Sequence, residues 1–548
     1  MKLFRNILFR NCPLILAFAT VWLIASSNIE TADAQVLSTG YEATDLKTLD
    51  PHGATGSQDR ILVEMIFNGL VRYPPGNMNA EFIEPDLATG WEVSSDGLTW
   101  TFQLRRNVMW HPFENNPPHE FSAEDVIYSL KKAADPKRSA FSSDYTGLSV
   151  MAVDKYTVRI RTENPLSQFL FLPKVANRAG GLVVCKRAFE EKGDEWNKTH
   201  PVGTGPFMFK SYTPQEKVIL AANPDYFRGA PKLAGIDWYY LPELSSAEMA
   251  LKKGEIVLLK GPREQVWADK MAKVPNIVVD TIPNPETFVA HFNLSVEPLH
   301  LMKVRQAIAH AVSREQFVAV FGAKVASPVY SPVPGGMMVS GFDRENAAKA
   351  GIIYEYNVEK AKKLLAEAGY PNGFSIKAFT SESTVFKKAY EVMQAQLRKV
   401  GINMDLSVVD HSTFHARIRE NLNSIVIYVC TRPNPDVILT QFYHSDSIVV
   451  SGGKPVTNFS HIGAIDADGD GKIDSVDDLI EAARREVDPK KQVQLWQDAQ
   501  KMILKYLVAL PIFNAGYVYA RNPHVEYGYE QVSVADGVKI TENSRIAK

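Results

Sequence analysis

Hydrophobic positions along this chain switch repeatedly between the period of a strand and the period of a helix. Thr99–Leu104 alternates polar and apolar residues, a period of two that is typical of a half-buried strand. After Asn357, a residue type suited to a helix N-cap, the apolar residues Ala361, Leu364 and Leu365 recur at helical spacing instead. Because strand-like and helix-like segments follow one another in this way, the pattern predicts an α/β fold.

The stretch from residue 200 to residue 240 predicts a β-hairpin that follows a glycine-containing loop. Gly203 and Gly205 are expected to adopt backbone angles that other residues avoid. Two apolar runs, 207–209 and 218–220, are separated by polar turn residues. Composition alone does not distinguish this segment from a buried hairpin in any α/β protein.

The first residues of the chain have the pattern of a cleaved secretory signal. Basic residues precede an apolar run at 13–25, and an A-x-A sequence ends at Ala34. The alternative is a retained membrane anchor, but the apolar run is shorter than a full span. We therefore expect residues 1–34 to be a signal peptide, cleaved after Ala34, and the mature chain to be exported.

Length, charge and cysteine content add further limits. A chain of 548 residues is too long for one core and predicts about three domains. Its formal net charge is −2 and its charged residues are interspersed, so nothing predicts a nucleic-acid partner. The mature chain has two cysteines, Cys185 and Cys430. They are either a disulfide or two free thiols, and free thiols are the preferred interpretation.

The same 200–240 stretch contains GTGPF followed by NPDYFRGAPKL, which resembles the signature of family 5 extracellular solute-binding proteins. The phrases PDLATGWEVSSDGLTWTFQLR, FSAEDVIYSLKK and YNVEKAKKLLAEAGYPNGF extend the resemblance over most of the chain. This family comprises the dipeptide, oligopeptide and nickel receptors of ABC importers. The resemblance implies a monomeric periplasmic receptor, not an enzyme, that passes a small, peptide-like solute to an ABC permease in the inner membrane.

The resemblance also implies an architecture, the two-lobe type II periplasmic-binding-protein fold of the large peptide-receptor subclass, with an extra subdomain. The implied segments are 35–75, 200–293 and 515–548 for the first lobe, 76–199 for the subdomain and 294–514 for the second lobe. The chain would then cross between the lobes near Leu294 and near Asn514. A solute would be trapped in the cleft when the lobes close on it.

Residues expected to face this solute come from both lobes, most of them by their position in the family motifs. They are Thr55, Gly56 and Ser57 after LDPH, Lys260 after a strand expected at 256–259, Tyr428, Val429, Cys430, Thr431 and Arg432 before NPD, and Phe513 and Asn514 at the second crossing. The alternative is that these residues only build the hinge and the floor of the cleft.

One of these positions departs from the family pattern. Peptide receptors place an aspartate in the second-lobe loop, where it pairs with the α-ammonium group of the peptide. Aligned on Asn434-Pro435, this chain has Thr431 there, followed by Arg432. Because a buried ammonium group needs a countercharge, recognition of a free peptide N-terminus is in doubt. Arg432 and Lys260 either hold a carboxylate or phosphate or point to solvent, which leaves a peptide, an opine, a sugar derivative or a metal complex open as ligand.

A separate motif, DADGDGKIDSVD at residues 466–477, resembles the calcium loops of EF-hand and dockerin proteins. The expected metal site consists of Asp466, Asp468, Asp470, Lys472, Asp474 and Asp477. Its last position is an aspartate where EF-hands usually have glutamate, which predicts weaker binding of Ca²⁺. Since the chain has one such loop and a dockerin would need two, we expect a local structural Ca²⁺. The alternative is an acidic, solvated turn.

Enzyme signatures are lacking. The sequence has no H-E-x-x-H, G-x-S-x-G or G-x-x-x-x-G-K-[ST] motif. His411 and His415 lie one helical turn apart and could share a metal, but a polar helix face is the preferred interpretation. A secreted hydrolase is the alternative from another functional class. A periplasmic sensor or chaperone-like binder is the alternative on the same scaffold.

Overall fold

The structure is a computed structural model that describes residues 35–176, 178–429, 432, 434–449 and 457–547. The expected signal peptide, Cys430 and Thr431 lie outside these ranges, so the expectations for them stay predictions. Within the described ranges, no helix combines the length and the apolar character that crossing a membrane requires.

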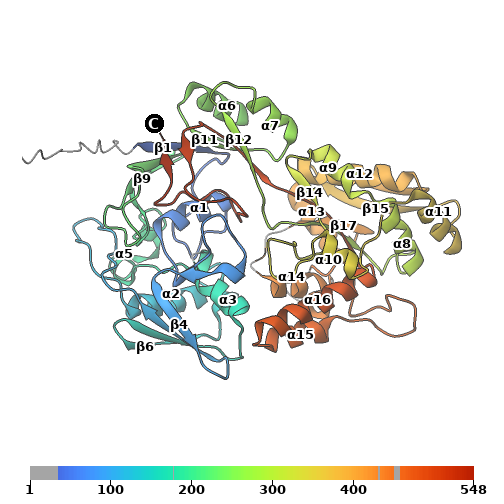
Figure 1. Cartoon of the computed structure of the whole chain (residues 1–548), viewed down its shortest axis with the longest axis horizontal. Coiled ribbons are helices and arrows are strands. Elements are labelled where there is room, and N and C mark those ends of the chain that lie inside the picture. The colour runs from blue at the N-terminus through green and yellow to red at the C-terminus, as the bar shows by residue number, and fades with distance from the viewer. Residues whose placement is uncertain (1–34, 177, 430–431, 433, 450–456, 548) are drawn as a thin grey trace, which may run out of the picture. The chain divides into compact units, whose positions relative to one another are not determined.

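The first lobe is built on a seven-stranded sheet with the strand order β12-β19-β11-β1-β10-β9-β8. Figure 1 labels four of its strands, β1, β9, β11 and β12. Its strand β1 runs parallel to β10 and β11, while the remaining pairs are antiparallel. The antiparallel pair β8 and β9 confirms the hairpin expected from the sequence. The strands are β1 (Val36–Tyr41), β8 (Phe207–Thr213), β9 (Lys217–Ala222), β10 (Gly235–Tyr240), β11 (Leu258–Gly261), β12 (Val278–Ile282) and β19 (Tyr517–Arg521).

The two glycines before this hairpin have a different role from the one expected. Neither Gly203 nor Gly205 adopts a positive φ. Instead, a Cβ atom on Gly203 would lie 1.8 Å from the carbonyl oxygen of Ile66, at the end of helix α1 (Ser57–Ile66). The amide of Gly205 donates to that same carbonyl at 2.8 Å. The glycines are therefore required by the close approach of two backbones and not by unusual angles.

Segment 76–199 has its own antiparallel sheet, in the order β4-β5-β7-β6, and its own apolar core. Helix α2 (Ala123–Ala134) packs against it and begins with a capping box between Ser122 and Asp125. The other strands and α-helices are β3 (Glu84–Pro85), β4 (Ala88–Val93), β5 (Thr99–Leu104), β6 (Ser149–Asp154), β7 (Thr157–Arg161), α3 (Ser142–Tyr145), α4 (Gln168–Phe171) and α5 (Lys186–Asn197).

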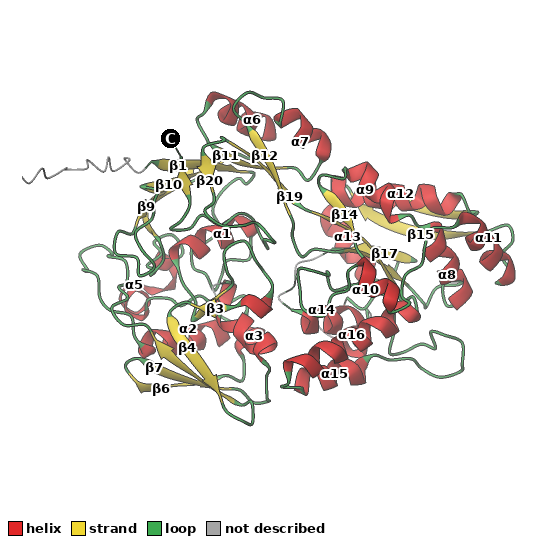
Figure 2. Ribbon diagram, in the orientation of Figure 1, coloured by secondary structure: helices red, strands yellow, loops and turns green. Residues whose placement is uncertain are grey.

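The second lobe contains a four-stranded sheet, β14-β18-β13-β17, and a parallel pair, β15 and β16. These strands are β13 (Phe288–Phe292), β14 (Ala326–Pro328), β15 (Phe374–Ser381), β16 (Ile402–Val409), β17 (Ile425–Tyr428) and β18 (Ala509–Ala515). Helices surround them (Figure 2). They are α8 (Met302–Ala311), α9 (Arg314–Phe321), α10 (Arg344–Lys349), α11 (Val358–Glu367), α12 (Thr384–Arg398), α13 (His411–Arg419), α14 (Pro435–Tyr443), α15 (Asp477–Arg485) and α16 (Pro489–Lys505). The side chain of Asn357 caps α11, as expected.

The chain passes between the two sheets at residues 283–287 and at Gly516. The crossing expected near Leu294 is wrong, because β13 is a fully buried central strand of the second sheet and follows the crossing. The crossing expected near Asn514 is two residues from Gly516. Asn514 joins the two crossings, since its amide donates to the carbonyls of Asn284 and Glu286. It therefore links the two segments that connect the sheets.

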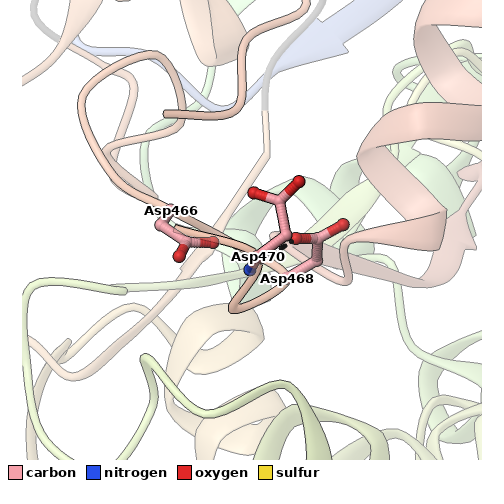
Figure 3. A group of neighbouring side chains, drawn as sticks. All are labelled: Asp466, Asp468 and Asp470. Atoms are coloured by element: carbon pink, nitrogen blue, oxygen red, sulfur yellow. Dashed lines mark hydrogen bonds between the residues drawn. The ribbon is translucent and has the colours of Figure 1, made fainter. Parts of the chain in front are cut away.

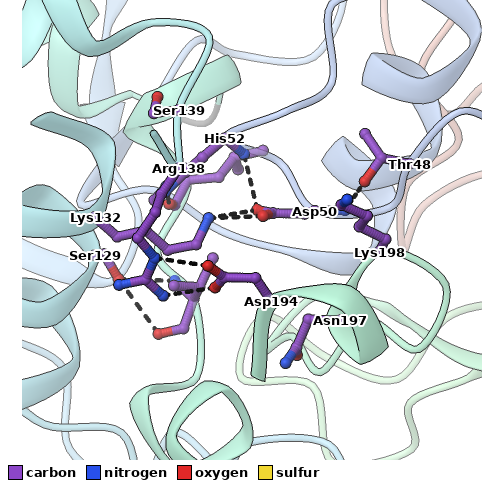
Figure 4. A network of polar contacts seen from close by, with 12 residues as sticks. Thr48, Asp50, His52, Ser129, Lys132, Arg138, Ser139, Asp194, Asn197 and Lys198 are labelled. Carbon is purple, nitrogen blue, oxygen red and sulfur yellow. Dashed lines mark hydrogen bonds and ion pairs between the residues drawn. The ribbon is translucent and has the colours of Figure 1, made fainter. Parts of the chain in front are cut away.

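A buried polar network connects the LDPH motif of the first lobe to helix α2 (Figure 4). The Lys132 ammonium group binds both carboxylate oxygens of Asp50 at 2.9 and 2.7 Å. Asp50 also accepts from the amide of His52, whose Nε2 lies 3.0 Å from the carbonyl of Leu182. Because each charged group in this pair meets its counterpart, the motif fixes segment 76–199 onto the first lobe.

Candidate functional site

Two of the expected ligand-facing residues of the first lobe meet at the hydroxyl of Tyr41. The Ser57 Oγ lies 2.7 Å from this hydroxyl, and the Lys260 Nζ donates to it at 3.3 Å. Tyr41 ends β1, and Lys260 lies within the neighbouring parallel strand β11, not after a strand as expected. Because parallel strands end at the same edge of a sheet, these side chains come together there.

The other two first-lobe positions belong to the start of helix α1. Gly56 is the N-cap residue and has no side chain to bind the free amides of the first turn. Thr55 is exposed, and its carbonyl accepts a hydrogen bond from Arg60. The structure thus brings Ser57 and Lys260 together and places Thr55 and Gly56 beside them in the chain.

Four cationic side chains, which we call the first-lobe cation cluster, surround this point: Arg60, Arg178, Lys260 and Arg263. The carboxylate of Asp536 accepts from the Nε of Arg60 at 2.9 Å and from the Nη2 of Arg178 at 3.0 Å. Burial opposes the ionisation of Asp536, but Arg178 and Arg60 nevertheless hold its pKa below the ordinary value. Of this cluster the sequence singles out only Lys260, because the residues that bind Asp536, Arg60 and Arg178, lie far from Asp536 in the chain.

Within the cluster, the Tyr517 ring lies between two cations. The Lys260 Nζ is 4.0 Å and the Arg263 guanidinium 4.1 Å from its centroid. Arg263 forms an ion pair with Glu286, on the crossing segment. Lys260 donates to the backbone carbonyl of Asp536 at 2.7 Å, and no carboxylate of the described residues lies within ion-pair distance of its Nζ. Burial and the neighbouring Arg263 lower the pKa of Lys260 to about 7.

On the second lobe, Tyr428 lines a small cavity of about 20 Å³ beside the crossing segment. Thr287 and His291 line the same cavity, and neither the Thr287 Oγ1 nor the His291 Nδ1 has a hydrogen-bond partner among the described residues. Burial lowers the pKa of His291 to about 3, so the ring is neutral. In the sequence, this cavity is indicated only by the histidine inside the apolar run FVAHF.

The loop after β17 is described in part. Val429 is half-buried and packs against the apolar core of the second lobe. The Arg432 Nε donates to the side chain of Gln441, and its guanidinium lies 5.7 Å from the ring centroid of Phe442, so it packs on helix α14 and does not simply point to solvent.

Phe513 lies in the core of the second lobe. Its ring is fully buried and stacks on Phe288 at 4.4 Å, with Phe317 and Phe321 on other sides. Its family position predicted a cleft residue, but four aromatic rings stack here in the core of the second lobe. The alternative reading of the sequence, a structural residue at the hinge, is the one that the geometry supports for Phe513.

The acidic loop brings three of its expected metal-site residues together. Ligand oxygens of Asp466, Asp468 and Asp470 lie within 4.8 Å of one another (Figure 3). Asp474 instead accepts from the amide of Ala467 at 2.8 Å. Asp477 starts helix α15 and accepts from the amide of Ser445 at 3.0 Å.

The side chain of Lys472 is exposed and pairs with Asp470 at 3.9 Å.

Arg305, on helix α8, contacts the backbone of the acidic loop and was not expected from the sequence. It is fully buried and donates to the carbonyls of Ala467 and Tyr506. Burial lowers the pKa of Arg305 to about 10, an effect that Asp474 partly opposes.

The remaining candidate groups form no larger site. The Nε2 atoms of His411 and His415 lie 3.1 Å apart, and Arg419 lies against the other ring nitrogen of His415 at 3.3 Å. A guanidinium at that nitrogen favours a hydrogen-bonded pair of rings over a metal site. Cys185 is a buried free thiol, and its expected counterpart Cys430 lies outside the described residues.

Known proteins resemble this chain over nearly its whole length. MoaA from A. tumefaciens R10, solved in complex with mannopinic acid, is 39% identical, with a TM-score of 0.73 over 94% of this chain and 100% of that one. DppA from Helicobacter pylori, in complex with the peptide STSA, is 28% identical, with a TM-score of 0.71 over 94% and 98%. Di/tripeptide-binding protein 2 of Pseudomonas aeruginosa is 26% identical over 82% of this chain and 83% of its own length.

A family match agrees with these similarities. Residues 83–448 match the family described as bacterial extracellular solute-binding proteins, family 5 Middle. Proteins of this family bind small solutes or peptides for ABC permeases and are not enzymes, which confirms the two-lobe fold and the transport role expected from the sequence. The chain belongs to family 5 of the bacterial extracellular solute-binding proteins.

Proposed function

We propose that this protein captures a small polar organic solute, a peptide or an organic acid, and delivers it to an ABC permease in the inner membrane. The observation that carries the proposal is the convergence of Ser57 and Lys260 at the Tyr41 hydroxyl. This point lies beside a chain crossing, because Arg263 of the same cluster binds Glu286 there. The relatives that bind mannopinic acid and the peptide STSA support the ligand class.

The mechanism follows from the hinge. Asn514 ties together the two segments that connect the lobes, so a change in backbone angles at 283–287 and Gly516 would move one lobe as a body. A solute that contacts both lobes favours the closed state by its additional contacts there. The cation cluster would hold the solute on the first lobe, and Tyr428 with the loop that contains Arg432 would hold it on the second.

The proposal also covers the processing, the location and the oligomeric state of the protein. Residues 1–34 would be removed after Ala34, and the mature chain would act in the periplasm as a monomer, with segment 76–199 as an extra subdomain. N-terminal sequencing and sedimentation of the exported protein test these points. A first residue other than Gln35, or a stable dimer, would contradict them.

The acidic loop is proposed as a structural Ca²⁺ site. Asp466, Asp468 and Asp470 would supply carboxylate oxygens, and the ion would neutralise part of their mutual repulsion. The support is the spacing of the acids and the proximity of their oxygens. Because Asp477 is held by the amide of Ser445, we expect at most a weak contribution from that residue.

Solute capture is tested on protein that has been unfolded and refolded to remove any solute carried through purification. Calorimetric titration with mannopinic acid, STSA and short peptides should give saturable binding of at least one, with one solute per chain. Absence of binding across the panel would contradict the proposed ligand class. Release of cleavage products from the same panel would instead support the hydrolase alternative.

A further inference from the structure

The first-lobe cation cluster contains more positive charge than its carboxylates balance. Arg60 and Arg178 share the carboxylate of Asp536, and Arg263 is paired with Glu286. Lys260 is the fourth cation and binds only uncharged groups among the described residues. When Lys260 is protonated, four cations against two carboxylates leave an excess of about two positive charges in a region largely withdrawn from water. Such an excess is costly unless a further anion offsets it.

Other groups around Lys260 do not supply that anion. The Tyr41 hydroxyl and the Tyr517 ring both contact its ammonium group, and burial raises the pKa of both tyrosines, so they stay neutral. Of the charges one step further out, Glu64 is paired with Lys539 at 3.2 Å. These contacts orient the ammonium group without neutralising it.

The start of helix α1 points to the same kind of ligand. The helix has ten residues, its N-cap Gly56 offers no side-chain acceptor, and Ser57 is linked to Lys260 through Tyr41. Free amides and the helix dipole make such an end favourable for anions. The acid of the first turn, Asp59, is buried and faces the backbone of Lys47, so it does not cover this end.

We infer that Lys260, with the uncapped start of helix α1, binds a carboxylate group of the solute, so that the protein is selective for acidic organic solutes. The inference rests on the proposed solute capture and names the solute class. Arg263 adds to the positive potential at this point, while Arg60 and Arg178, already engaged by Asp536, fix the cluster in place. A neutral ester or amide of the same solute would leave Lys260 without a countercharge.

The test compares acids with their neutral derivatives on refolded protein at pH 6. The probes are mannopinic acid and its methyl ester, and STSA and its C-terminal amide. For the acid that binds best, we expect Lys260→Met to lower affinity at least tenfold and esterification or amidation to do the same. The two losses should not add, because both remove the same contact. Lys210→Met is the matched control, since Lys210 is an exposed lysine on strand β8 of the same sheet.

The possible results of this test separate the inference about Lys260 from the proposed solute capture. Unchanged affinity of Lys260→Met for the acid, or equal binding of acid and ester by the unaltered protein, would overturn the inference and leave solute capture intact. Absence of binding of every probe to the unaltered protein would overturn the proposed function and this inference with it. If Lys260→Met does not fold, the comparison of acid with ester on the unaltered protein still decides the question.

Discussion

Two lysines withdrawn from water show opposite ways of accommodating a charge. Lys132 is fully buried, and its ammonium group contacts both oxygens of the Asp50 carboxylate (Figure 4). Lys260 has a carbonyl, a hydroxyl and an aromatic ring around it instead. Burial lowers the pKa of each, and for Lys132 the Asp50 carboxylate opposes this effect directly. A matched charge stabilises the fold, whereas we infer that the unmatched charge on strand β11 binds a ligand.

Breaking the matched pair should have the largest effect. Lys132→Met leaves the Asp50 carboxylate buried without its partner, which costs about 3–5 kcal/mol of unfolding free energy. Urea denaturation followed by circular dichroism measures this loss. Lys155→Met is the control, because the ion pair of Lys155 with Glu120 is exposed, and its loss should be much smaller. Equal losses in the two variants would contradict the assignment of Lys132 to the stability of the fold.

Binding of Ca²⁺ should have the next largest effect on stability. The acidic loop is a third arrangement of charge, a cluster of aspartates. Here the acids repel one another, so Ca²⁺ should stabilise the protein by about 2.7 kcal/mol at a concentration one hundred times its Kd. The double substitution Asp468→Ala and Asp470→Ala should abolish the calcium-dependent rise in Tm and change solute affinity little. Scanning calorimetry with Ca²⁺ and with EDTA measures both states. If EDTA leaves the Tm of the unaltered protein unchanged, no such site exists.

The pH dependence of solute binding should further distinguish the unpaired Lys260 from the paired Lys132. The pKa of Lys260 is about 7 in the free protein, and a bound carboxylate favours the charged form. Affinity for an acid should therefore be full below pH 7 and fall as the pH rises, by about tenfold between pH 6 and pH 8. The facing Asp536 and Tyr41 do not titrate in this window, since the pKa of the first is lowered and that of the second raised.

Calorimetric titrations at several pH values measure this dependence. Lys260→Met should remove it, and Lys210→Met should retain it. An affinity that rises with pH, or a slope that survives in Lys260→Met, would mean that another group controls binding.

The smallest effect concerns the other end of a peptide ligand. If Thr431 stands where the family has an aspartate, that position offers no countercharge to an α-ammonium group. A peptide and its N-acetylated form should then bind within about 1 kcal/mol of each other, about fivefold in affinity. Competition against a fluorescent ligand measures the ratio. A hundredfold loss on acetylation would show that another acid has taken over this role.

Local features of the fold could be predicted from the sequence because their causes are local. The capping residues Ser122 and Asn357 and the β8–β9 hairpin follow from residue type and spacing. The position of β13 could not be predicted in this way, since an apolar run does not reveal which sheet it joins. Phe513 is a similar case, because its burial depends on rings contributed by β13 and α9.

In the candidate site too, only the features with local causes could be predicted from the sequence. Ser57 and Lys260 were found through motif position and residue type, but their link through Tyr41 depends on the order of the strands. The bond between Arg60 and Asp536 spans 476 positions in the chain, so no local pattern could reveal it. The charge balance that separates Lys260 from Lys132 is a property of the folded chain alone.

The central claim, capture of an acidic solute by Lys260, is tested most directly by identifying what the protein carries when it is purified without unfolding. Native mass spectrometry of the unaltered protein, Lys210→Met and Lys260→Met gives the mass of any bound solute. The account predicts a small organic acid on the first two proteins and its loss from Lys260→Met. A neutral or cationic solute held equally by all three proteins would contradict it.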